Sequence, residues 1–197
     1  MQDSLDNTVA IAFERSLQVL RKAGAQIEEI ALHEISELAS INATGGLSAA
    51  ESYAWHRKSI TAHQADYDPR VALRILRGAS MTAFNYIDLL AARAEWITRM
   101  EMSLQGFDAV LSPTVPMVAP AISSVLNDDT EFFRVNGLLL RNTSVVNMLD
   151  GCGISLPCHA PDELPVGLML WHAAMHDDAV LDAALQVETL LKQSLSK

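Results

Sequence analysis

Mostly apolar residues recur at steps of three and four over Asp3–Ala23, a spacing that places them on one face of a helix. Gly24 follows, where a glycine commonly ends a helix. The alternating stretch Gln26–Leu32 then predicts a strand, because successive side chains of a strand point to opposite faces. A helix followed by a strand is a unit from which α/β sheets are built.

Residues 33–106 are mostly helical by the same criteria. Ser48 and Glu51 have the spacing of a capping box, and Asp68-Pro69 has the order of an N-cap followed by a proline at the first helical position. The helices predicted in this region are Glu34–Ala43, Ser48 to about Ala65, Asp68 to about Gly78, and Thr82–Gln105.

Three short apolar runs bounded by proline, glycine and aspartate predict buried strands at Asp108–Ser112, Gly153–Leu156 and Val166–Trp171. We expect them in one sheet, with the last two adjacent and antiparallel through the turn at 158–165. Helices are predicted over Glu131–Leu149, capped by Asp129 or Thr130 and irregular at Gly137, and over Asp178–Ser194.

Apolar strands need cover on both faces, and the helices Asp3–Ala23 and Asp178–Ser194 are the candidates. The predicted fold class is therefore a helix-rich α/β fold, a layered α/β/α arrangement with a mixed sheet. Few strands are predicted for so many helices, so we expect the remaining strands of the sheet in a part that precedes this chain.

Several motifs resemble the C-terminal part of the amidase signature family. They are Gly106–Pro116, Leu138–Asn147, Gly153–Pro157 and Leu164–Leu170, with further similarity over Ala50–His56 and Asp68–Gly78. The resemblance covers nearly the whole chain. It implies an incomplete amidase signature fold, with residues 1–197 as the C-terminal portion of an amidase domain and the catalytic portion absent.

The residues that such enzymes use for catalysis have no counterpart here. The family works with a Ser–cis-Ser–Lys triad, whose serines lie in a Gly/Ser-rich stretch. The lysines of this chain are Lys22, Lys58, Lys192 and Lys197, and none has a matching context. Ile122 and Val125 flank the pair Ser123-Ser124. We therefore predict no catalytic residue, and expect this chain alone to be inactive.

Composition excludes some function classes. The net charge is −10 and the basic residues form no block, which disfavours nucleic-acid binding. No apolar run reaches the roughly 18–20 residues that span a bilayer, so we expect no membrane partner. No segment has the pattern of a signal peptide, so we expect a cytoplasmic location.

We expect Cys152 and Cys158 to be free thiols. The histidines lack metal-ligand spacings, so we expect no metal and no cofactor.

Two groups of residues are candidates for a substrate channel. Tyr53 and His56 belong to a polar and aromatic cluster on one helix, and Arg70 lies in a first helical turn, where a cation opposes the helix dipole. The loops after Ser112 and Leu156 add Thr114, Pro116 and Cys158. For the helix residues, a solvated face or a local salt bridge is the competing interpretation.

The asparagines and Arg141 of residues 136–147 lie on an otherwise apolar helix. Our first choice is that they pin the proline-ended loops by hydrogen bonds, and substrate contact is second.

The sequence predicts a fragment of an amide-hydrolysing enzyme that acts on a small amide in its full-length form. One alternative is a non-catalytic binding or interaction module, and another is part of the amidase subunit of a glutamine-dependent amidotransferase. Half of a layered core would leave apolar surface uncovered. We therefore expect self-association, most simply a homodimer through the uncovered face.

Overall fold

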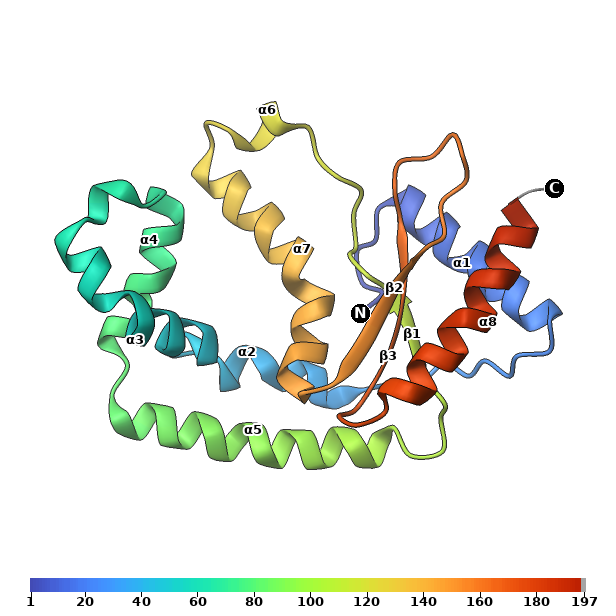
Figure 1. Cartoon of the computed structure of the whole chain (residues 1–197), viewed down its shortest axis with the longest axis horizontal. Helices are drawn as coiled ribbons and strands as arrows, with labels where there is room; N and C mark the ends of the chain where they lie inside the picture. Colours follow the sequence, from blue (N-terminus) through green and yellow to red (C-terminus); the bar gives the residue numbers. More distant parts are fainter. Residues whose placement is uncertain (196–197) are drawn as a thin grey trace. The chain divides into compact units, whose positions relative to one another are not determined.

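The computed structural model describes residues 1–195, and Figure 1 shows its helices and strands. The chain divides into two compact units. The first contains residues 1–31 together with the chain from residue 100 onward, and the second contains residues 32–99. Among the described residues, none of the helices is both long enough and apolar enough to cross a membrane.

The first unit contains a three-stranded sheet with the order β1-β3-β2. Its strands are β1 (Val110–Pro113), β2 (Cys152–Pro157) and β3 (Gly167–His172). Both pairs are antiparallel, with Ser112 and Ser155 each opposite Met169. The prediction of one sheet with β2 and β3 adjacent is confirmed. The predicted mixed sheet is wrong for the described residues, because the short 158–166 connection allows only an antiparallel pair and β1 joins β3 in the same sense.

Helices cover both faces of this sheet, as a layered α/β/α arrangement requires. The helices α1 (Asn7–Lys22) and α8 (Asp177–Leu195) pack side by side over one face, where Leu156, Leu168 and Leu170 enter the same core (Figure 1). On the other face, Val146 of α7 (Asp129–Leu149) lies beside Gly153 of β2. The prediction that α1 and α8 provide the cover on both faces is therefore wrong, because their apolar stripes pack against each other as well as against the same face of the sheet.

The segment predicted as a strand, Gln26–Leu32, has no regular secondary structure. Ile27 packs at the edge of the core to which α1 contributes, while Glu28 and Glu29 remain exposed. The alternation of apolar and polar residues is present, but the segment pairs with none of the three described strands. Since a strand needs a neighbour to bond its backbone, alternation alone did not produce one.

The second unit is helical. It contains η1 (His33–Glu37), α2 (Leu38–Ile41), α3 (Gly46–Ala62), η2 (Gln64–Asp66), α4 (Pro69–Leu76) and η3 (Arg77–Ser80), and most of α5 (Ala83–Ser103). Ile60, Ala72 and Ile75 form its small core. A side chain at Gly78 would overlap the carbonyl group of Ala49, so glycine allows η3 to pack closely against α3.

Helix starts follow the local sequence in one case and not in others. Asp68 caps α4 as predicted, accepting hydrogen bonds from the backbone of Arg70 and Val71. The predicted capping box at Ser48 is wrong, because α3 begins two residues earlier, at Gly46. The residue before it, Gly45, has a φ of 119°, which favours glycine. Asp128 caps α7, one residue before the predicted caps. That helix runs unbroken through Gly137, and the short helix α6 (Ile122–Val125) was not predicted.

Candidate functional site

Two hydroxyl groups meet at one end of the sheet. Thr114 follows β1, and its backbone N–H donates to the carbonyl oxygen of Gly167 at 2.9 Å. Its side-chain oxygen lies 2.6 Å from that of Ser155 on β2. Ser155 alternates with Leu156, which faces α1 and α8, so the hydroxyl pair lies on the opposite face. Ser155 is exposed there and could bond a ligand.

Gly167 makes room for this pair. It begins the central strand β3, opposite Pro157 of β2. A Cβ atom at this position would overlap the hydroxyl oxygens of both Thr114 and Ser155. A side chain at position 167 therefore cannot coexist with the observed positions of the two hydroxyl groups.

A buried amide on α7 fixes the end of β1. Asn142 donates to the carbonyl oxygen of Pro113 at 2.7 Å and to that of Met1 at 3.1 Å. Arg141 donates to the carbonyl oxygens of Met1 and Asp3. The bond to Pro113 places Asn142 in the predicted pinning role, whereas Arg141 holds the N-terminal segment and no proline-ended loop. Since Thr114 follows Pro113 directly, this bond also positions the hydroxyl pair.

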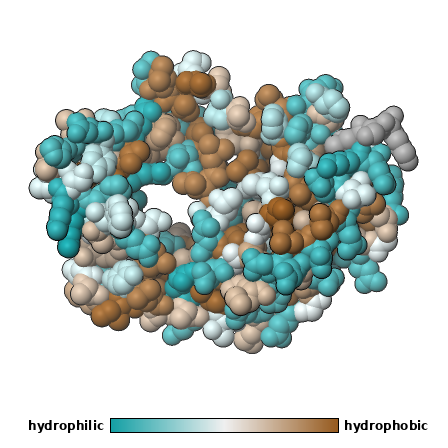
Figure 2. Space-filling view, in the orientation of Figure 1, coloured by the Kyte–Doolittle hydropathy of each residue, from teal (hydrophilic) through white to brown (hydrophobic). Residues whose placement is uncertain are grey.

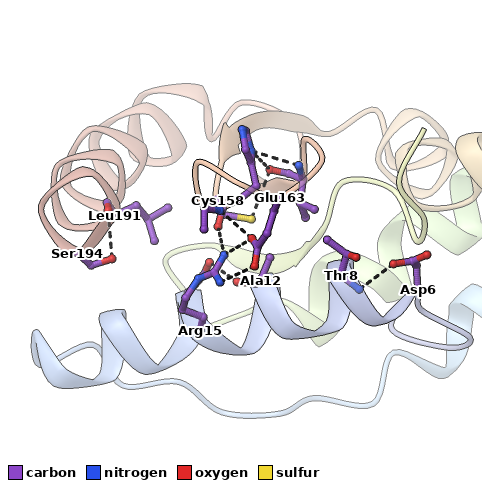
Figure 3. A network of polar contacts seen from close by, with 12 residues as sticks. Asp6, Thr8, Ala12, Arg15, Cys158, Glu163, Leu191 and Ser194 are labelled. Carbon is purple, nitrogen blue, oxygen red and sulfur yellow. Dashed lines mark hydrogen bonds and ion pairs between the residues drawn. The ribbon is translucent and has the colours of Figure 1, made fainter. Parts of the chain in front are cut away.

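An ion pair holds the loop between β2 and β3 against α1 (Figure 3). Arg15 of α1 makes two hydrogen bonds to the carboxylate of Glu163, at 2.6 and 2.9 Å, and a third to the carbonyl oxygen of Cys158 at 3.0 Å. The backbone N–H of Ala160 also donates to Glu163. The bonds from Arg15, followed by the bond from Ala160, lower the pKa of Glu163 to about 2. Both groups are therefore charged at neutral pH, and we call this ion pair the Arg15–Glu163 clamp.

Cys158, predicted to line the channel, lies inside the core beneath α1 and α8 with 2% of its surface exposed. Its thiol points to the carbonyl oxygen of Val166 at 3.5 Å, and burial raises its pKa. A buried thiol with a raised pKa is a poor nucleophile. The structure does not bring Cys158 together with Thr114, whose side chain lies on the other face of the sheet.

Pro116 is buried, and its carbonyl oxygen accepts a hydrogen bond of 2.8 Å from the backbone of Asp6. Asp6 in turn caps α1 through the backbone N–H of Thr8. Pro116 therefore links the loop after β1 to the start of α1.

The other predicted channel residues belong to the second unit. His56 Nδ1 lies 3.0 Å from the hydroxyl oxygen of Tyr67, and the two rings are nearly perpendicular. Tyr53 packs against the small core around Ile60. Arg70 is half-buried just after the Asp68 cap. The structure thus pairs His56 with Tyr67, and a channel shared with Thr114 stays a prediction.

Sequence reasoning missed Ser155, Gly167, Arg15 and Glu163. Ser155 had a local signal, because it is a hydroxyl residue inside an otherwise apolar strand bounded by proline. Arg15 and Glu163 had none, because 148 positions separate them in the sequence.

No catalytic triad is assembled among residues 1–195. Ser123 and Ser124 lie on α6, where Ser124 donates to the carbonyl oxygen of Ala121, and no described hydrogen bond joins either serine to a lysine. Lys192 pairs with Glu188 at 2.8 Å, and Lys197 lies outside the described residues. The same part of the chain holds no group of three or more histidine, cysteine, aspartate or glutamate side chains arranged for a metal ion.

Curated relatives are longer than this chain. The 2-amino-5-chloromuconic acid deaminase of Comamonas testosteroni is 27% identical over 192 residues, which cover 97% of this chain and 41% of the deaminase. A glutamyl-tRNA(Gln) amidotransferase subunit of Syntrophomonas wolfei is 33% identical over 127 residues, which cover 62% of this chain and 25% of that protein. The chain thus spans about two fifths of the deaminase.

Solved structures share the fold. Kluyveromyces lactis allophanate hydrolase superposes with a TM-score of 0.83 at 22% identity, over 94% of this chain and 30% of the hydrolase. The crystal structure of an amidase superposes with a TM-score of 0.69 at 25% identity, over 90% of this chain and 41% of that enzyme. In sequence, the amidase family matches residues 1–181. This chain belongs to the amidase family.

Proposed function

We propose that this chain supplies the C-terminal scaffold and part of the substrate pocket of an amide-hydrolysing enzyme, and not its catalytic triad. One observation carries the proposal. The family match covers residues 1–181, yet the described residues assemble no serine and lysine pair. The nucleophile and the lysine would come from the rest of the enzyme, which is the larger part in the deaminase relative.

In the reaction of this family, a serine attacks the amide carbonyl, backbone N–H groups hold the oxyanion, and water cleaves the acyl-enzyme. The described chain would contribute positioning to these steps. Thr114 and Ser155 would form part of the pocket wall and hydrogen-bond a polar group of a small amide. Asn142 and the Arg15–Glu163 clamp would hold the two loops that carry this wall.

Amide hydrolysis by a chimera tests this proposal. The C-terminal part of the Comamonas deaminase would be replaced by this chain, and the chimera and the isolated chain would be assayed on a panel of small amides. We expect turnover by the chimera and none by the isolated chain. Hydrolysis by the isolated chain that a serine substitution within residues 1–197 abolishes would refute the proposal.

A second candidate is the amidase subunit of a glutamine-dependent amidotransferase. It is favoured by the relatives named as subunits of glutamyl-tRNA(Gln) amidotransferase, one of which, from Halobacterium salinarum, matches 95% of this chain at 24% identity. Grafting the chain into such a protein and measuring ammonia release from glutamine separates the two candidates. Turnover of glutamine alone among the tested amides would favour the amidotransferase.

We also propose that the isolated chain associates with itself, most simply as a homodimer. The outer edges of β1 and β2 have no strand partner within the described residues. Apolar side chains are also exposed, among them Ile122 and Leu126 around α6 and Leu185 on α8, and Figure 2 shows such patches on one face. Light scattering should give twice the monomer mass at high concentration, and a monomer without hydrophobic-dye binding would contradict this.

The cytoplasmic location stays a prediction.

A further inference from the structure

The second unit contains an open pocket of about 280 Å³ that the proposed function does not use. It lies where the turn before α3 meets η3 and the start of α5. The lining residues are Ala43, Thr44, Arg77, Ser80, Met81 and Asn85. All of them belong to the same compact unit, so the pocket is formed by residues 32–99 alone.

Several side chains of this lining carry hydrogen-bond donors. The side-chain oxygen of Asn85 accepts from both the backbone and the hydroxyl group of Thr82, at 3.2 and 2.6 Å. Its NH₂ group is therefore left to donate elsewhere. Thr44 adds a hydroxyl group and Arg77 a guanidinium group, whereas the hydroxyl group of Ser80 already donates to the backbone of Arg77.

The charge of the pocket has the opposite sign to that of the whole protein. The chain carries a net charge of −10, yet the lining has no aspartate or glutamate and includes the cation Arg77. A guanidinium group presents its donors in a planar fork that matches a carboxylate. The single positive charge of Arg77 balances the charge of one carboxylate, whereas a phosphate group carries nearly two negative charges and is commonly bound by more than one cation.

We propose that this pocket binds the carboxylate group of a small molecule. Arg77 pairs with the carboxylate, Asn85 and Thr44 donate to it, and Met81 contacts the apolar part of the ligand. The volume lies just below the usual range for ligand pockets, so it suits a compact acid rather than a chain or a polymer. The proposal holds whether or not the chain belongs to an amide-hydrolysing enzyme.

Titration of the whole chain with butyrate, which has one carboxylate and a short apolar tail, followed by NMR at constant ionic strength, tests the proposal. We expect saturable shifts of the Thr44, Arg77, Ser80 and Asn85 signals, with a dissociation constant of the order of 1 mM. The variant Arg77→Gln should bind at least about tenfold more weakly, because a charged hydrogen-bonded pair is lost. The matched control is Arg74→Gln, which removes the same charge from α4 outside the pocket and should bind like the unaltered chain.

Three results would overturn the proposal. They are the absence of saturable shifts in the unaltered chain, equal binding by Arg77→Gln, and tighter binding of inorganic phosphate than of butyrate. Thr44→Val keeps the shape of the side chain and removes one donor, so it should weaken binding. This second variant keeps the proposal testable if Arg77→Gln does not fold.

Discussion

The side-chain amide of Asn142 donates a hydrogen bond of 2.7 Å to the carbonyl oxygen of Pro113, which lies 29 positions earlier in the sequence. Asn142 is completely buried, and it also bonds the carbonyl oxygen of Met1. One side chain thus joins α7, the end of β1 and the first residue of the chain. The bond to Pro113 fixes the end of β1, where the chain leaves the sheet and continues into Thr114.

Replacing Asn142 by alanine should destabilise the first unit by about 2–3 kcal/mol. The buried carbonyl oxygen of Pro113 loses its side-chain donor, while that of Met1 keeps the bond from Arg141, and a buried polar group that loses its partner costs more than the bond itself contributes. The midpoint of urea unfolding measures the loss. Ser144→Ala, at an exposed position of the same helix, is the matched control and should change little. Equal midpoints for the two variants would contradict the pinning role.

Replacing Gly167 by alanine should cost about 1–3 kcal/mol, because the new methyl group overlaps the hydroxyl oxygens of Thr114 and Ser155. The cost should fall when Ser155→Ala is combined with it, since one of the two overlapping oxygens is then gone. A double-mutant cycle in urea measures this coupling, and strict additivity would count against the overlap. Gly137→Ala, with open space around it in α7, should not destabilise the chain.

The clamp between Arg15 and Glu163 should stabilise the protein in a pH-dependent way. The pKa of Glu163 is lowered from an ordinary value of 4.5 to about 2, so folding favours the charged carboxylate. Its contribution is complete above pH 4.5 and is lost as the pH falls towards 2. The melting temperatures of the unaltered chain and of Glu163→Gln should therefore differ most at neutral pH and converge in acid.

A control for that experiment is Glu188→Gln, which removes the exposed ion pair with Lys192 on α8. Exposed pairs contribute little, so its melting temperature should stay close to that of the unaltered chain at neutral pH. A Glu163→Gln difference that does not depend on pH would show that the clamp acts through packing and not through charge.

The two cysteines should differ in reactivity. Cys158 is buried and Cys152 is half-buried, and desolvation raises the pKa of both thiols. Iodoacetamide at pH 8 should modify Cys158 at least about tenfold more slowly than Cys152 in the folded chain, because Cys158 reacts only after local opening. Mass spectrometry of the variants Cys152→Ala and Cys158→Ala gives each rate separately. Urea should bring the two rates together, and equal rates already in the folded chain would contradict the burial of Cys158.

Local signals in the sequence were enough to predict many of the helices and strands. Signals within single stretches predicted α1, α5, α7 and α8, and the proline-bounded apolar runs predicted β1, β2 and β3. The pair Asp68-Pro69 predicted the start of α4, because a cap needs only the next few residues. The motif order predicted the family. Each of these inferences uses interactions that are close in sequence or patterns that are read directly from it.

Which helices and strands contact one another depends on how the chain packs, and local sequence signals do not show it. The packing places α1 and α8 on one face, gives Gln26–Leu32 no strand partner among residues 1–195, and buries Cys158 away from Thr114. The contacts that carry the site join positions 41 residues apart for Thr114 and Ser155, and 148 apart for Arg15 and Glu163. Such contacts form because the packed layers bring distant segments together. The local pattern around a residue indicates whether its side chain is buried. It does not indicate which distant residue that side chain will contact.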